Sequence, residues 1–90
     1  MEVLFKRTFI KDFENLPNDI KKEVKEICIC IFPGIESLSE FKKYPFRKLK
    51  GFENYYRIKI GNFRIGFKKI NHQVIFMRIL HRKDIYRHFP

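Results

Sequence analysis

The chain has 90 residues and carries 20 Lys and Arg against 10 Asp and Glu, which gives it a formal net charge of +10. Its hydrophobic fraction of 44% and aromatic fraction of 17% exclude a disordered chain, and its length fits one folded domain spanning residues 1–90. The longest apolar run is far shorter than the ~20 residues of a membrane span, and no export signal opens the chain, so we expect a cytoplasmic protein without a membrane partner.

The first third of the chain predicts a strand followed by two helices. Residues 2–7 alternate as a short strand, and Thr8 is the expected N-cap of a first helix. Pro17 suits the first turn of a second helix, which Pro33-Gly34 ends. The apolar residues of this second helix recur at the spacing of a core-facing stripe: Ile20, Val24, Ile27, Cys28 and Ile31. We expect the two helices to form a hairpin across a sheet.

The cysteine and histidine content predicts no metal site. Cys28 and Cys30 stand two residues apart in the predicted helix and point to different faces, which disfavours a disulfide. Two cysteines are too few for structural zinc, and the three histidines show no ligand spacing. We therefore expect no metal, no cofactor and a reducing compartment.

The middle of the chain is ambiguous, and its end predicts three strands. A helical turn over residues 36–41 and a basic loop precede Gly51. Alternating patterns then predict strands over residues 55–60, from residue 63 onward, and over residues 73–80. The basic loop holds Lys42, Lys43, Arg47, Lys48 and Lys50. Residues 83–89 fit one helical turn.

Register predicts one basic sheet face. A two-residue turn at Gly61-Asn62 places Lys59 opposite Arg64 and Arg57 opposite Gly66, with the apolar residues on the other face.

Two registers are open for the last strand. A two-residue loop at Asn71-His72 would put Arg78 on the apolar face. A three-residue loop over 70–72 instead aligns Ile75, Met77 and Ile79 with the apolar face and delivers Arg78 to the basic face, opposite Arg64. We favour the second register because it keeps the arginine out of the core.

The signs of charge are sorted along the chain. Residues 1–41 hold 6 basic and 8 acidic side chains, whereas residues 42–90 hold 14 basic and 2 acidic ones. A general bias toward lysine would not separate the signs in this way. The basic half therefore predicts a polyanionic partner.

A phosphate site is the sharper interpretation of the basic face, and a merely solvated sheet face is the alternative. Like charges opposite one another destabilise a sheet, and Asp84 is the only nearby carboxylate that the pattern offers. Gly66 is expected to leave room for a nucleic-acid backbone. The expected stacking surfaces for bases are Tyr55, Phe76 and Tyr86.

Cleavage of RNA through its 2′-hydroxyl needs a proton acceptor, cations for the developing charge and a donor to the leaving oxygen. His81, Arg82 and Tyr86 supply an imidazole, a guanidinium and a phenol just past the last strand. A phenol is a poor base unless neighbouring cations favour its ionised form. Taken alone, this triplet is weak evidence for catalysis.

The motifs together resemble the RelE/ParE toxin superfamily of type II toxin–antitoxin systems, and most closely its RelE-like branch. The similarity is carried by Lys48–Gly51, Tyr55–Ile65 and Leu80–Tyr86, and by Thr8–Phe13 followed by Leu16-Pro17. It implies an α+β fold in which an N-terminal strand and a helical hairpin accompany a small, mostly antiparallel sheet with a C-terminal three-stranded meander. It also implies a ribosome-dependent endoribonuclease that cuts mRNA in the A site without a metal.

The resemblance also assigns roles to residues. Arg57, Lys59 and Arg64 match the stabilisers of phosphate and transition state, and Arg82 matches a leaving-group donor or phosphate clamp. Tyr86 matches the base, with His81 as the alternative. The remaining candidates, for RNA or ribosome contact, are Lys42, Lys43, Arg47, Lys48, Lys50, Lys68, Arg78 and Lys83.

The expected partners are the ribosome, mRNA and a cognate acidic antitoxin that competes with RNA for the cations. Apolar surface near the helical hairpin is the expected second anchor of that antitoxin. Two alternative functions remain at this point. One is a ParE-like toxin that inhibits DNA gyrase without cutting RNA, and the other is a non-catalytic RNA- or ribosome-binding module.

Overall fold

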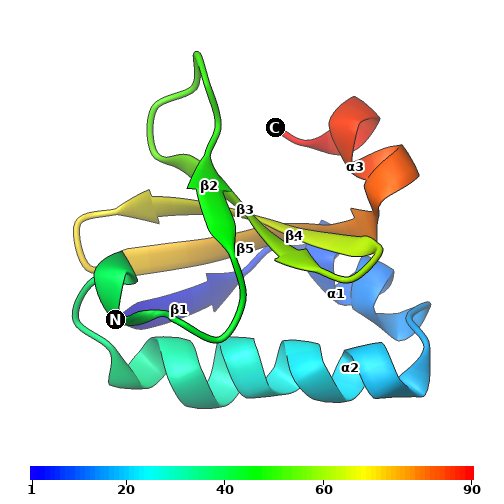
Figure 1. Cartoon of the computed structure of the whole chain (residues 1–90), viewed down its shortest axis with the longest axis horizontal. Helices are drawn as coiled ribbons and strands as arrows, with labels where there is room; N and C mark the ends of the chain where they lie inside the picture. The colour runs from blue at the N-terminus through cyan, green and yellow to red at the C-terminus, as the bar shows by residue number, and fades with distance from the viewer.

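The computed structural model describes residues 1–90, and a five-stranded sheet of strand order β1-β5-β4-β3-β2 forms its centre (Figure 1). β1 runs parallel to β5, and all other neighbours are antiparallel. In chain order the elements are β1 (Glu2–Phe5), α1 (Arg7–Glu14), α2 (Asn18–Lys25), η1 (Glu26–Ile31), η2 (Phe32–Gly34), η3 (Leu38–Glu40), β2 (Phe46–Lys48), β3 (Tyr55–Ile60), β4 (Phe63–Ile70), β5 (Gln73–His81) and α3 (Arg82–His88).

The helices lie on both sides of the sheet. α1 and α2 lie on one side, which we call the inner face, and α3 lies on the other side, the outer face (Figure 1). α2 continues into the π-helical η1 and the 3₁₀-helical η2. The predicted α+β class, the helical hairpin and the meander β3–β4–β5 are confirmed. Every helix of the chain is too short or too polar to cross a bilayer.

The main core fills the space between the inner face and the helices. The predicted stripe is confirmed at its centre, where Val24, Ile27 and Cys28 are buried. Phe32, which no stripe position predicted, is completely buried, and its ring meets Phe76 edge-on at a centroid distance of 5.2 Å. Each such buried side chain contributes about 1.5–3 kcal/mol to folding. Phe76 is itself completely buried, so the expectation that its ring stacks on RNA bases is wrong.

Thr8 does not cap the first helix. β1 already ends at Phe5, and Lys6 occupies the N-cap position without a side-chain cap. The Thr8 hydroxyl instead donates to the carbonyl oxygen of Met77 at 2.9 Å, so it ties α1 to β5. A residue of a type that often caps helices can instead hydrogen-bond to a strand distant in sequence, and the local pattern does not reveal which it does.

The register of β5 corrects the prediction. Asn71 and His72 form a two-residue turn, with Asn71 at φ 53°, and Ile70 pairs with Gln73. A bulge at Met77 then shifts the ladder by one residue. A turn of this length favours a residue with positive φ, and the bulge returns the following residues to the face that the hydrophobic pattern requires.

The bulge decides which residues face the core. Arg78 pairs with Gly66 and not with Arg64, so the predicted pairing is wrong. The buried residues of the strand are Val74, Phe76 and Ile79. Neither of the two regular registers considered from the sequence contained a bulge.

β2 forms where the sequence predicts a loop. It is only three residues long, and it pairs antiparallel with β3 so that Arg47 stands opposite Arg57. The predicted helical turn over 36–41 is the shorter η3, closed by reciprocal Ser37 and Glu40 capping bonds. The predicted C-terminal turn is confirmed as α3.

A second cluster packs α3 against the outer face. Leu49, Ile85 and Phe89 are buried together. A Cβ atom at Gly66 would lie 2.6 Å from Cγ of Phe89. The space above Gly66 is therefore filled by the Phe89 ring, and the expectation that it receives a nucleic-acid backbone is wrong.

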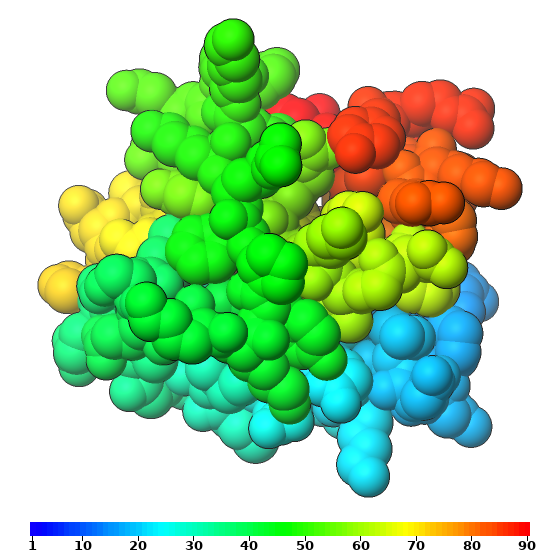
Figure 2. Space-filling model, in the orientation of Figure 1, coloured from blue at the N-terminus to red at the C-terminus, as the bar shows by residue number.

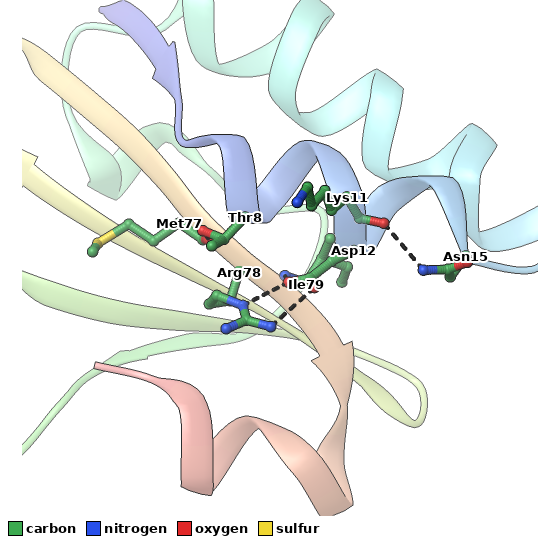
Figure 3. Close-up of polar contacts among 7 residues, drawn as sticks. All are labelled: Thr8, Lys11, Asp12, Asn15, Met77, Arg78 and Ile79. Atoms are coloured by element: carbon green, nitrogen blue, oxygen red, sulfur yellow. Dashed lines mark hydrogen bonds and ion pairs between the residues drawn. The ribbon is translucent and has the colours of Figure 1, made fainter.

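Arg78 and Asp12 form the most enclosed ion pair (Figure 3). Arg78 Nε and Nη2 donate to the Asp12 carboxylate at 2.7 and 3.0 Å, and the backbone N–H of Ile79 donates to it at 3.2 Å. Side-chain exposures are 23% for Arg78 and 10% for Asp12. The carboxylate thus accepts a backbone N–H of β5 beyond the point where β1 ends, a role that the sequence pattern does not predict.

We predict that Asp12→Ala lowers the free energy of unfolding by about 2–4 kcal/mol, because it leaves an arginine and a backbone N–H without their acceptor. Chemical denaturation followed by circular dichroism measures this. Asp84→Ala is the control, since its pair with Arg87 is long, at 3.8 Å, and exposed. Equal losses in the two variants would contradict the structural role of Asp12.

Candidate functional site

A basic hollow of about 260 Å³ lies on the outer face, where β2, β3 and β4 meet α3. No carboxylate is among the residues that line it. In Figure 2 these green, yellow-green and orange-red segments meet on the viewer's side. The lining residues are Pro45, Phe46, Arg47, Arg57, Lys59, Arg64 and Tyr86.

The pairing of β2, β3 and β4 determines where the four cations of the hollow lie. Arg47 stands opposite Arg57, and Lys59 stands opposite Arg64. The predicted β3–β4 register is therefore confirmed, and β2 adds a fourth cation. Like charges at directly opposite positions cost about 0.2–1 kcal/mol per pair, and no lining carboxylate offsets this repulsion. The arrangement suits a bound phosphate, which supplies the missing negative charge.

Arg64 is oriented by the hairpin turn. Its Nη1 donates to the carbonyl oxygens of Gly61 at 2.8 Å and Phe63 at 2.9 Å. A guanidinium has five N–H groups, so donors on Nε and Nη2 remain for a ligand. The turn thus holds the side chain in place before any ligand binds.

Tyr86 brings a phenol to the hollow from α3. Its side chain is 65% exposed, and the guanidinium carbon of Arg57 lies 4.6 Å from its ring centroid. Such a contact is worth about 0.5–1 kcal/mol at an exposed site and orients the ring. The hydroxyl is therefore available beside the cations.

His81 faces away from the hollow. It pairs with Phe63, whose ring it meets at 5.6 Å, and Phe63 packs against the inner core. Its Nδ1 also accepts the backbone N–H of Lys83 at 3.2 Å and so caps α3. Because alternate residues of a strand point to opposite faces, this imidazole is separated from the cations by the sheet.

Lys43 is held by the helices. Its Nζ contacts Glu26 and lies 3.1 Å from Glu23, and the Tyr44 hydroxyl donates to Glu23 at 2.8 Å. The hydrogen bonds to Glu26 and Glu23 raise the pKa of Lys43 to about 12. The bonds from Tyr44 and Lys43 hold the pKa of Glu23 below its usual value. Lys43 thus anchors the chain just before β2.

The other predicted contacts lie outside the hollow. Arg78 is bound to Asp12, and Lys68 lies over the Tyr55 ring at 5.2 Å. Arg82 is exposed at the start of α3, and its backbone N–H donates to Asn62 at 2.7 Å, beside the turn that holds Arg64. The last four predicted contact residues are exposed outside the hollow: Lys42, Lys48, Lys50 and Lys83.

Pro45 and Phe46 line the hollow although sequence analysis did not select them. Phe46 pairs with Ile58 as the first residue of the edge strand β2, and Pro45 directly precedes it. A strand of three residues is too short for its alternation to be visible, so no sequence signal identified them.

No metal-ligand group is formed, since no three His, Cys, Asp or Glu side chains come together. Both cysteines are free; Cys28 is buried, which raises the pKa of its thiol, and Cys30 is exposed. The chemistry available in the hollow is therefore that of cations and a phenol.

Comparison with known proteins gives matches over the whole chain. A family model described as the ParE toxin of the type II toxin–antitoxin system parDE matches residues 3–86. Toxin RelE3 of Methanocaldococcus jannaschii is 46% identical over 90 residues, which cover all of both chains.

Solved structures share the fold. The RelB–RelE antitoxin–toxin complex from Methanococcus jannaschii matches with 42% identity and a TM-score of 0.82, covering 97% of this chain and 99% of that one. The isolated RelE toxin of E. coli matches with 14% identity and a TM-score of 0.66 over 96% of each chain, a likeness of fold alone.

We predict that Arg47→Ala weakens binding of a single-stranded oligoribonucleotide, whereas Lys43→Ala leaves it within about twofold, because Lys43 is already neutralised by two carboxylates. Fluorescence anisotropy over a range of salt concentrations measures this. The negative slope of log K against log[salt] should become shallower by about 0.7 for Arg47→Ala, because one phosphate contact is lost. A similar fall for Lys43→Ala would contradict the anchoring role.

Proposed function

The chain belongs to the ParE toxin family of type II toxin–antitoxin systems and is a toxin of the RelE type; from this premise we propose that it is an endoribonuclease that cleaves mRNA in the ribosomal A site. The observation that carries the proposal is the basic hollow, in which four cations and a phenol meet without a carboxylate. We propose residues 1–90 as one functional domain acting in the cytoplasm, where ribosomes are.

The proposed reaction is attack of the 2′-oxygen on the adjacent phosphorus. Tyr86, reacting as its phenolate, accepts the proton of the 2′-hydroxyl and becomes the phenol, and the phosphorus–5′-oxygen bond breaks as the new bond forms. A proton from solvent completes the 5′-hydroxyl, and the other product ends in a 2′,3′-cyclic phosphate. Of the two base candidates, Tyr86 is favoured because its side chain lines the hollow and that of His81 faces the inner core.

The cations stabilise the charge that develops on the phosphate oxygens. Arg57, Lys59 and Arg64 line the hollow, and Arg64 is already oriented by the turn. Donors that are fixed before the reaction need not reorganise during it, which is the basis of electrostatic catalysis. Arg82 is assigned to a hydrogen bond with the leaving 5′-oxygen, because it starts α3 beside the same turn.

We propose a cognate antitoxin as the inhibitor, since a relative of 42% identity has been solved with its antitoxin RelB. Acidic side chains of the antitoxin would neutralise the hollow. An apolar groove of about 150 Å³ between α1 and α2 is the proposed second anchor, and Ile10 and Ile29 at this groove are 46% and 61% exposed.

The second candidate is the inhibition of DNA gyrase that the resemblance to ParE-like toxins implies, and it is kept because the matching family model is described as a ParE toxin. It requires no proton acceptor beside the cations. The ribosome assay below separates the two candidates.

We predict that the purified protein cuts a defined message on ribosomes, and that Tyr86→Phe lowers the cleavage rate by about 10²–10⁴-fold, because the ring remains and the proton acceptor is lost. Mapping of 3′ ends measures the rate. Tyr44→Phe is the matched control, since its hydroxyl contacts Glu23 on the helical side.

Full activity of Tyr86→Phe would contradict its role as the base. Intact mRNA together with accumulated cleaved DNA–gyrase complexes would support the second candidate. Binding to ribosomes without any cleavage of RNA or DNA would support the remaining alternative, a non-catalytic ribosome-binding module.

A further inference from the structure

The loop between β2 and β3 presents an exposed aromatic ring away from the basic hollow. This loop is the green projection at the top of Figure 1. Phe52 is 50% exposed, and its ring meets Tyr55 edge-on at 6.3 Å. Tyr55 in turn packs on the buried Phe89 at 5.6 Å. We call Phe52, Tyr55 and Phe89 the aromatic step.

The loop holds this ring in place. The backbone N–H of Leu49 donates to Tyr55 at 2.8 Å, and that of Lys69 donates to Asn54, also at 2.8 Å. Gly51 at φ 84° and Asn54 at φ 68° take the left-handed conformations that the tight loop requires. The exposure of Phe52 is therefore a built feature of the loop, and it suits a flat apolar partner.

Two cations lie near the step. Lys68 Nζ lies 5.2 Å from the centroid of the Tyr55 ring, and Lys50 is exposed in the loop itself. Glu53 is the one carboxylate of the loop. A partner that combines a flat ring with negative charge fits this surface, and a nucleotide of single-stranded RNA has both.

The step and the hollow share one strand. Tyr55, Arg57 and Lys59 alternate along the outer face of β3, so Tyr55 lies about 13 Å from Lys59, at ~3.3 Å per residue. An RNA strand bound in the hollow can thus reach the step without leaving the face.

We infer that the aromatic step is a subsite for an unpaired base that flanks the cleaved bond. The base stacks on the Phe52 ring, and Lys68 binds the adjoining phosphate. The inference rests on the proposed function, because it takes the RNA in the hollow to be the substrate. It assigns to Phe52 a contact with substrate outside the hollow.

Phe52→Trp tests the stacking directly, because the chain has no tryptophan of its own. We expect a single-stranded oligoribonucleotide to quench the emission in a saturable way that parallels binding measured by anisotropy. An abasic strand of equal length and charge should bind about 5- to 150-fold more weakly. Ile29→Trp, an exposed position on η1, is the control and should stay unquenched.

Unchanged emission while anisotropy reports binding would overturn the inference, and so would equal binding of the abasic strand or no binding to the wild-type protein. In the ribosome assay, Phe52→Ala should lower kcat/KM about tenfold or more, with circular dichroism checking that it folds. If Phe52→Ala cuts as well as wild type, the subsite fails and the proposed function stands. If the wild type does not cut, the proposed function fails, and quenching of Phe52→Trp still reports on stacking.

Discussion

Mutual repulsion among Arg47, Arg57, Lys59 and Arg64 is the constraint on which the rest of the structure depends. Three neighbouring strands carry these cations on one face, and no carboxylate lines the hollow between them. The opposite face of the same strands supplies the stability that this face lacks, since Ile58, Ile65 and Phe67 are completely buried there. One sheet therefore keeps a strongly basic outer face because the buried core of its inner face is apolar.

Acidic side chains pair with cations outside the hollow and leave those that line it unpaired. Asp12 neutralises Arg78, and Glu23 and Glu26 neutralise Lys43, so the carboxylates of the helical half bind the cations that hold the fold together. The cations of the hollow receive no such partner. The separation of charge along the chain thus becomes a division between structural and functional cations in space.

Much of this could be predicted from the sequence, for physical reasons. The β3–β4 register followed from a two-residue turn and strict alternation, and it correctly placed Lys59 opposite Arg64. The helical stripe followed from spacing alone. Both depend on contacts that are local or on a short turn.

Other features depend on contacts between distant segments. The bulge at Met77 interrupts the alternation that the prediction assumed, and it changed the partner of Arg78. The ring of Phe89 over Gly66 and the orientation of His81 follow from how α3 leaves β5, which no local pattern contains. β2 is too short to show a period, so Pro45 and Phe46 were missed at the hollow.

The most direct test of this account is the free energy of unfolding of Lys59→Gln at low and high salt. At about 10 mM salt the variant should be more stable than wild type by about 0.5 kcal/mol, and at about 1 M salt the difference should vanish, because salt screens the repulsion. Lys42→Gln, at an exposed lysine outside the hollow, should show neither effect. A Lys59→Gln protein that is less stable than wild type at low salt would contradict the claim that the hollow holds uncompensated charge.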